Sequence, residues 1–431
     1  MNILIAILLL GIIIFIHELG HFLLAKKNNI TVTEFSLGMG PRLASFVKNG
    51  TRYSIKLLPI GGSCMMLGED EEVEDEGAFH KKGVWARFSV IFAGAFFNFI
   101  LALVLAFVVI SSVGVDYPTV LNVEEDSAVY EAGLREGDLI KKINGKRIHF
   151  GKEIDLYFFF NPITGEPIDV TYERDGEKYE TTIYPKPLPP HYRLGIQYSS
   201  ETENAVLLVV EPGFPFYEAG ITAGDIITSI NGTPIKTGQD MVDYFDANPL
   251  TGAPIEITYI HGKEEKTATI TPKLVTSGYS LGLTYNMYRE KVSPLKAIIN
   301  SFFELKYNIN YTISSLKYLL SGKASINEIS GPVGIVTIVD NIVEQTEDEG
   351  VGIVLLNLAN FATYLSANLG VINLLPFPAL DGGRLVFIII EAIRRKPIPK
   401  EKEAMVHLIG LALLMLLMVF VIFNDFRKIF G

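Results

Sequence analysis

Four long apolar stretches constrain this chain more than any other feature, at about residues 3–25, 88–113, 352–375 and 404–423. A helix needs about 20 apolar residues to cross the hydrocarbon core of a bilayer, and each stretch reaches that length. The mean hydropathy of +0.31 over 431 residues is also high for a purely soluble protein. The sequence therefore predicts a multi-pass α-helical membrane protein with four transmembrane helices.

The first stretch could be a cleaved signal peptide, but its flanks favour a permanent span. It lacks a basic n-region, is too long for an apolar signal core, and is followed by Lys26 and Lys27 in place of a cleavage site. Lys and Arg gather in the loops at 26–87 and 384–403, although Arg427 and Lys428 run against the pattern. By the positive-inside rule these loops are cytoplasmic, and the N-terminus and the large middle segment are extracytoplasmic in an inner or plasma membrane.

Composition excludes several classes of protein. Cys64 is the single cysteine, so an intramolecular disulfide and a multi-cysteine zinc site are excluded. The chain has 37 Lys and Arg against 48 Asp and Glu, with no basic run of five or more residues. Nucleic acid is therefore not an expected partner, whereas the lipid bilayer is.

The middle segment repeats itself with a constant offset of 87 residues. The phrase EAGLREGDLIKKINGKRI, which begins at Glu131, returns as EAGITAGDIITSINGTPI at Glu218. Alternating runs and Asn-Gly turns predict two extracytoplasmic α+β units, at 114–199 and 200–290. The shared form A-G-x-x-x-G-D-x-I-x-x-I-N-G resembles PDZ domains, which bind an extended peptide as an added strand. Leu194 and Leu281 begin candidate peptide-binding loops, and a spacer or size filter without peptide binding is an equal alternative.

A zinc-binding pattern lies near the cytoplasmic end of the first span, where the sequence reads His17-Glu18-Leu19-Gly20-His21. Two histidines four residues apart share one face of a helix, so both imidazoles can reach one zinc ion. Glu18 can then act as general base on water whose pKa zinc lowers to about 7. Ionisable side chains facing lipid are unfavourable, so this cluster indicates a site. A polar cluster between helices without metal is the alternative.

Catalytic zinc usually has three protein ligands and one open position. The segment 373–383, NLLPFPALDGG, lies at the cytoplasmic end of the third span, the expected depth of the two histidines. Pro376 and Pro378 interrupt the helix there, and irregular backbone at that depth is tolerated only beside protein or a cavity. Asp381 is therefore the expected third ligand, and an ordinary helix N-cap is the alternative.

Together these motifs resemble the bacterial site-2 protease family, the intramembrane zinc metalloproteases, and in particular the sigma-E regulator type with tandem PDZ domains. The resemblance covers nearly the whole chain. It implies one zinc ion per chain, bound by His17, His21 and Asp381, with Glu18 as the catalytic acid and base.

The same resemblance implies residues that contact substrate. The family's G-x-x-x-N motif matches 94–98, although Ala95 stands where many relatives carry proline. Residues 38–40, followed by the strand-like run 53–58, resemble the family's membrane-associated β-hairpin, whose edge would pair with an unwound substrate strand. A simple surface hairpin is the alternative. The substrate-binding residues implied in this way are Asn98, which would orient substrate or stabilise the oxyanion, Asn373, Pro378, Gly38 and Gly40.

The resemblance implies a zinc-dependent endopeptidase that cleaves transmembrane segments of single-span proteins, such as anti-sigma factors and signal-peptide remnants. Such substrates would first be cleaved on the outer side, because the PDZ pair would exclude bulky outer domains. The catalytic parts are then 1–113 and 352–431, joined through the amphipathic segment 291–351. A membrane adaptor with a structural metal is one rival, although such a site needs no Glu18. A transporter is another, although only the soluble segment repeats.

Overall fold

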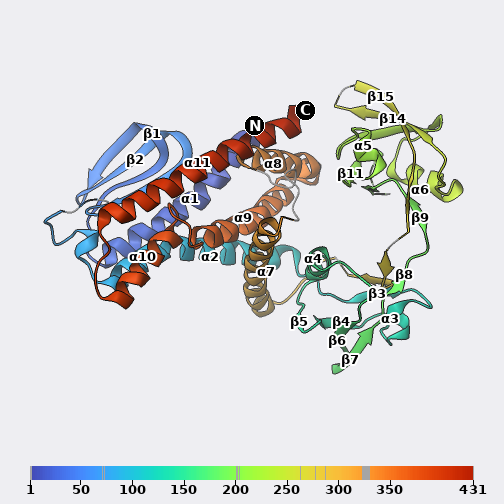
Figure 1. Cartoon of the computed structure of the whole chain (residues 1–431), viewed down its shortest axis with the longest axis horizontal. Helices are drawn as coiled ribbons and strands as arrows, with labels where there is room; N and C mark the ends of the chain where they lie inside the picture. Colours follow the sequence, from blue (N-terminus) through green and yellow to red (C-terminus); the bar gives the residue numbers. More distant parts are fainter. Residues whose placement is uncertain are drawn as a thin grey trace. The chain divides into compact units, whose positions relative to one another are not determined.

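The computed structural model describes residues 2–69, 71, 73–199, 202, 204–262, 264–276, 278–286, 288–322 and 331–430. They form two compact units, which can be followed by colour along the sequence in Figure 1. The first unit comprises Met1–Tyr117, His149–Phe160 and Met287–Gly431 and is mainly helical. The second comprises Pro118–Ile148 and Asn161–Asn286 and is mainly β-structure.

Among the described residues, four helices of the first unit are long and apolar enough to cross a membrane, which confirms the predicted apolar helices. They are α1 (Asn2–Lys27), α2 (Val84–Val113), α9 (Val351–Asn373) and α11 (Lys400–Phe430). α2 is central, because α1, α7 (Pro294–Leu320), α9 and α10 (Asp381–Arg394) all pack against it. On α11, by contrast, large apolar side chains such as Leu416 and Phe423 remain exposed, as expected of a helix that faces lipid.

A long antiparallel hairpin follows α1, formed by β1 (Val32–Lys48) and β2 (Thr51–Met66). Asn49 and Gly50 make its two-residue turn with φ of 50° and 76°, as this kind of turn requires. The register shifts around Gly38 and Gly40, whose φ values are 86° and 89°. β1 is largely buried up to this bend and exposed beyond it. The predicted hairpin is therefore present, and the two glycines bend it.

α7 is amphipathic, as predicted, but its polar face points inward. Glu304 on that face binds the ammonium of Lys152 at 2.7 Å, and Lys152 begins α4 (Lys152–Phe160). On the opposite face, Leu295 and Phe302 are exposed. The other helices described in this unit are α8 (Pro332–Thr346) and the short helices Phe79–Lys81 and Glu347–Glu349.

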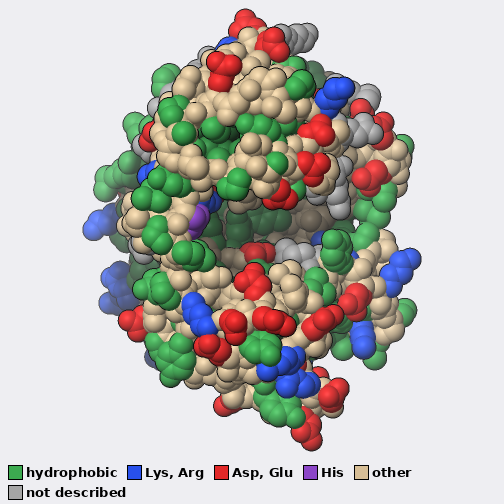
Figure 2. Space-filling model, turned by 90° about the vertical axis from the view of Figure 1, so that its right-hand side faces the viewer, with side chains coloured by type: hydrophobic (Ala, Val, Ile, Leu, Met, Phe, Trp, Pro, Cys, Tyr) green, Lys and Arg blue, Asp and Glu red, His purple; other side chains and the backbone are tan. Residues whose placement is uncertain are grey.

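The second unit contains two lobes, each built on a four-stranded antiparallel sheet. The strand order is β5-β4-β6-β7 in the first lobe and β13-β12-β14-β15 in the second. On the face shown in Figure 2, acidic, basic and hydrophobic side chains are interspersed. The elements of the first lobe are β3 (Val120–Val123), α3 (Ala128–Glu131), β4 (Leu139–Ile143), β5 (Lys146–Arg147), β6 (Ile168–Arg174) and β7 (Glu177–Ile183). Those of the second are β11 (Leu207–Val210), α5 (Pro215–Glu218), β12 (Ile226–Ile230), β13 (Thr233–Pro234), α6 (Gly238–Ala247), β14 (Ile255–His261) and β15 (Glu264–Ile270).

The strands that end the two sequence repeats are exchanged between the lobes. β10 (Ile196–Tyr198) ends the first repeat but pairs with β11 of the second lobe. β18 (Leu283–Tyr285) ends the second repeat but pairs with β3 of the first lobe. Leu194 accordingly belongs to the buried core of the second lobe. The boundary expected at residues 199 and 200 thus describes the sequence repeat, whereas strand pairing crosses it.

Two chain segments run side by side between the lobes as a result. β8 (Lys186–Pro187) pairs with β17 (Tyr279–Ser280), and β9 (His191–Arg193) pairs with β16 (Lys273–Val275), both antiparallel. A contact between a glycine and a tyrosine ring occurs twice here, once in each sequence repeat, with the offset of 87 residues. A Cβ on Gly165 would lie 2.9 Å from the Tyr279 hydroxyl, and a Cβ on Gly252 would lie 3.0 Å from the Tyr192 hydroxyl. The second lobe is therefore an insertion that enters and leaves the first lobe through paired strands.

Candidate metal centre

The first span presents two histidines on one buried face. His17 and His21 lie one turn apart in α1, and their exposed fractions are 7% and 6%. Their Nε2 atoms are 3.2 Å apart. α1 can approach α2 closely here because Gly20 has no side chain: a Cβ on it would lie 2.4 Å from the carbonyl oxygen of Ala93. Both imidazoles therefore face the protein interior.

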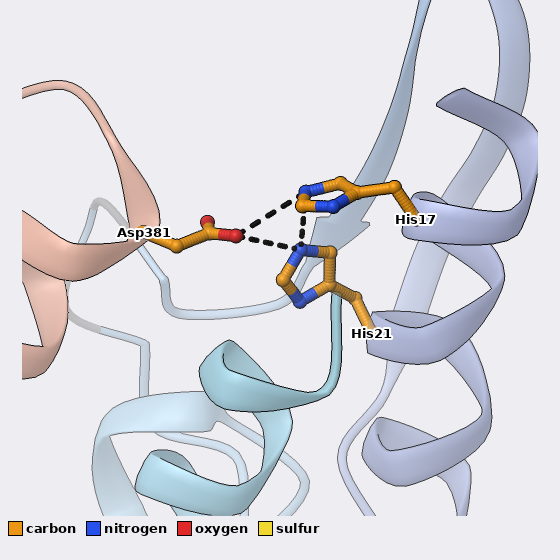
Figure 3. Close-up of side chains that lie close together, drawn as sticks. All are labelled: His17, His21 and Asp381. Carbon is orange, nitrogen blue, oxygen red and sulfur yellow. Dashed lines mark hydrogen bonds and ion pairs between the residues drawn. The ribbon is translucent and has the colours of Figure 1, made fainter. Parts of the chain in front are cut away.

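Asp381, the first residue of α10, completes the group, as Figure 3 shows. Its Oδ2 lies 3.2 Å from Nε2 of His17 and 3.3 Å from Nε2 of His21. Residues from opposite ends of the chain thus meet at one point, as the two motifs predicted. Beside this group, one buried apolar core connects the end of α1, the base of the hairpin, the start of α2 and α10. It includes Ala25, Val32, Val90, Leu385 and Ile388.

The three ligand atoms form a nearly equilateral triangle with edges of 3.2–3.3 Å. Zinc binds imidazole nitrogen and carboxylate oxygen at about 2.0–2.1 Å, and tetrahedral geometry then separates neighbouring ligand atoms by about 3.3–3.4 Å. The two Nε2 atoms lie within hydrogen-bonding distance of each other, and Oδ2 of Asp381 forms an ion pair with both imidazoles. Within the described chain the buried Oδ2 accepts no hydrogen bond. The donor set and its spacing therefore fit zinc with three protein ligands and one open position.

Glu18 lies beside this triangle without being part of it. A Cβ on Gly62 of β2 would lie 2.9 Å from Cγ of Glu18, so the strand passes directly against this side chain. The Glu18 carboxyl also lies close to the backbone of Cys64 in the same strand. The hairpin thus holds a carboxyl group next to the ligand cluster, where a general base is required.

α2 contacts the imidazoles through three residues spaced four positions apart. The carbonyl oxygen of Val90 lies 2.9 Å from Nδ1 of His21. A Cβ on Gly94 would lie 2.3 Å from Nε2 of His21 and 2.7 Å from Cε1 of His17. The side-chain amide of Asn98 lies 3.3 Å from Nδ1 of His17. The G-x-x-x-N match is therefore a surface shaped around the two imidazoles.

Replacing Gly94 with Ala is expected to weaken zinc binding, because the added methyl group and the imidazoles would occupy the same space. Overpacking a dense interior typically costs about 1–3 kcal/mol, which corresponds to roughly 5- to 150-fold in affinity. Zinc affinity measured by chelator competition on purified protein tests this. Gly11→Ala is the matched control, because a Cβ on Gly11 of α1 meets nothing within 4 Å. Equal affinities for the two variants would contradict the assignment.

Backbone contacts shape the segment that leads into Asp381. Cβ atoms on Gly382 and Gly383 would lie 2.1 and 2.4 Å from carbonyl oxygens of that segment, so both positions require glycine. Ala379 has a left-handed φ of 75°, and its N–H donates to Nδ1 of His407 in α11 over 2.9 Å. No motif in the sequence predicts this contact, because a backbone N–H leaves no trace in a motif.

The other predicted site residues lie outside the group formed by the three ligands, Glu18 and Asn98. Asn373 ends α9, and Pro378 packs against Gly410 of α11. Gly38 and Gly40 form the bend of β1. Their predicted contact with substrate stays a prediction.

Comparison with known proteins points to one family over nearly the whole chain. The pattern of peptidase family M50 matches residues 5–417. The chain is 32% identical to the zinc metalloprotease RasP of Geobacillus kaustophilus, over 98% of this chain and 97% of that protein. It is also 32% identical to the regulator of sigma-W protease RasP of Bacillus subtilis, over 98% of each chain. Among solved structures, the PDZ domain of an SdrC-like protein from Listeria monocytogenes matches 20% of this chain and 92% of its own length, at 25% identity and a TM-score of 0.15.

Proposed function

Since this chain belongs to peptidase family M50, the site-2 proteases, and is an intramembrane zinc metalloprotease, we propose that its substrates are the transmembrane segments of single-span membrane proteins. The Bacillus subtilis relative is named for the regulation of sigma-W. We accordingly assign anti-sigma factors, together with signal-peptide remnants, as the substrate class of this chain. The bilayer is its working environment.

One observation carries the proposal. His17, His21 and Asp381 form a triangle of zinc dimensions, and Glu18 lies next to it in a helix apolar enough to span a membrane. A structural zinc site needs no neighbouring carboxyl base, whereas a hydrolytic one does. We propose that these three ligands hold one zinc ion per chain and that Glu18 is the catalytic residue.

The chain's own residues then act in a simple order. When bound, zinc polarises the scissile carbonyl and makes water a nucleophile at neutral pH. Glu18 accepts a proton from the attacking water, whose oxygen bonds to the carbonyl carbon. As the carbon–nitrogen bond breaks, Glu18 donates that proton to the leaving amine, and its carboxylate returns to the starting state.

A transmembrane helix must unwind before it can be hydrolysed, because its carbonyl groups are hydrogen-bonded within the helix. We propose that the edge of the β1–β2 hairpin pairs with the unwound segment, as an exposed strand edge can. Gly38 and Gly40 set the shape of that edge, and Asn373 and Pro378 contact the substrate beside the metal centre.

Mapping the cleavage position tests this proposal directly. Purified protein is reconstituted with a single-span substrate in liposomes, and the products are identified by mass spectrometry. We expect one zinc-dependent cut inside the apolar segment. Cleavage confined to residues outside that segment, or cleavage that persists after chelation, would contradict the proposed function.

The distribution of Lys and Arg supports a cytoplasmic metal centre, with the N-terminus and the second unit extracytoplasmic in a bacterial inner or plasma membrane. In that orientation the second unit lies on the side from which bulky outer domains would approach. We therefore propose that it excludes substrates whose outer domains have not already been removed.

Excising the second lobe is expected to relax this size filter. Arg193 and Lys273 face each other in the β9–β16 pair, so an Asn-Gly turn can replace residues 194–272 while the first lobe keeps its strands. Cleavage of an untrimmed substrate should rise toward that of its trimmed form, whose own rate serves as the control. An unchanged preference for trimmed substrate would rule out filtering by this lobe.

A further inference from the structure

We propose that Asn98 is a positioning residue whose side-chain oxygen accepts a hydrogen bond from Nδ1 of His17 and orients that imidazole toward the metal. The proposal rests on the zinc site of the proposed function. It gives Asn98 a role on the enzyme's own ligand, in place of the substrate or oxyanion contact that the family resemblance implies.

The side chain of Asn98 is fully enclosed between helices. Its exposed fraction is 0%, and its Nδ2 lies 3.3 Å from Nδ1 of His17. Its backbone carbonyl oxygen accepts a hydrogen bond from the hydroxyl of Ser366 in α9 at 2.8 Å. The side-chain Oδ1 is buried and accepts no hydrogen bond from the described residues. A buried amide oxygen without a donor is unfavourable, so a partner for it is expected.

The chemistry of His17 identifies that partner. Nε2 of His17 points at Asp381 and His21, so Nε2 is the nitrogen that faces the metal. A neutral imidazole that binds a metal through Nε2 carries its proton on Nδ1 and needs an acceptor there. A half-turn of the Asn98 amide exchanges Nδ2 and Oδ1 and places the acceptor against Nδ1. The same rotation satisfies both the orphaned oxygen and the ligand proton.

His21 shows the same arrangement one turn away. Its Nδ1 lies 2.9 Å from the carbonyl oxygen of Val90 on the same helix. Gly94, midway between Val90 and Asn98, leaves the space into which both rings fit. α2 thus supplies an acceptor for each imidazole, from the backbone for His21 and from a side chain for His17. Such outer hydrogen bonds fix ring orientation and raise the basicity of the ligand nitrogen.

Two substitutions separate positioning from oxyanion stabilisation. Asn98→Leu removes the acceptor at similar size, and outer partners of this kind change metal affinity by about 10- to 100-fold. Asn98→Asp keeps an acceptor. Zinc affinity is measured by chelator competition on the purified full chain, because the loss of an oxyanion contact, which forms only during catalysis, would leave this affinity unchanged. Circular dichroism verifies the helical content of each variant.

We expect Asn98→Leu to bind zinc about 10- to 100-fold more weakly than the parent, and Asn98→Asp, which keeps the acceptor, to bind zinc like the parent. Asn368→Ala, which removes another amide from the spans, is the matched control and should bind zinc like the parent; its amide bonds the Tyr364 hydroxyl. Parental zinc affinity in Asn98→Leu, or zinc binding in Asn98→Asp as weak as in Asn98→Leu, would overturn the positioning role while leaving the zinc site intact. A parent chain that binds no zinc would instead overturn the proposed function.

Discussion

Glu18→Gln is expected to lower turnover by about 10²- to 10⁴-fold, the usual contribution of a general acid–base residue, while zinc still binds. The amide is nearly isosteric with the carboxyl but cannot accept the proton of the attacking water. Because Glu18 lies beside the ligand triangle and is not one of its corners, the metal keeps its three protein ligands. Turnover of a single-span substrate and zinc content, measured on the same sample, test both parts.

Glu349→Gln provides the matched control, since Glu349 is exposed in a short helix before α9. It should behave like the parent in both measurements. If Glu18→Gln retained full turnover, Glu18 would not be the base. Loss of zinc together with activity would instead place Glu18 among the ligands.

Asp381→Ala is expected to remove zinc from the protein and all hydrolysis with it. The substitution removes one of three protein ligands and leaves only the two imidazoles. Zinc affinity should therefore fall by more than the roughly 10- to 100-fold known for residues that only hydrogen-bond to a ligand. Metal analysis after dialysis, compared with the parent, gives the stoichiometry directly. We expect one zinc per chain in the parent and none in the variant.

Asp348→Ala is the matched control for this experiment, because Asp348 is exposed and distant in sequence from the centre. It should keep its zinc. An Asp381→Ala chain that still held one zinc ion would contradict the three-ligand site. Asp381 would then serve only to begin helix α10.

The meeting of His17, His21 and Asp381 was predictable because each of the three residues follows a strong local rule. Length and hydropathy define the spans, and the four-residue spacing of His17 and His21 defines a helical face. Asp381 was then the acidic residue at the corresponding depth of a broken span. The same argument from depth in the membrane predicts that the two ends of the chain lie side by side.

The exchange of strands between the lobes could not be predicted in this way. β10 lies in the phrase LGIQY and β18 in LGLTY, so hydrophobic pattern and turn chemistry fit either lobe equally. Register within a strand follows from side-chain alternation, but alternation does not say which of two similar lobes a strand will join. The contacts of Asn98 and His407 escaped prediction for a related reason, because they join single atoms on different helices.

The exchanged strands also set the order in which the two lobes can be completed during synthesis. The strands described in the second lobe, from β10 to β15, lie within residues 196–270, so that lobe can close as soon as this stretch has emerged. β3 of the first lobe, at Val120–Val123, must wait for β18 at Leu283–Tyr285, about 160 residues later. At about 5–20 residues per second this delay lasts roughly 8–32 s. The lobe made first is therefore finished last, and its open edge must be shielded from other chains throughout that interval.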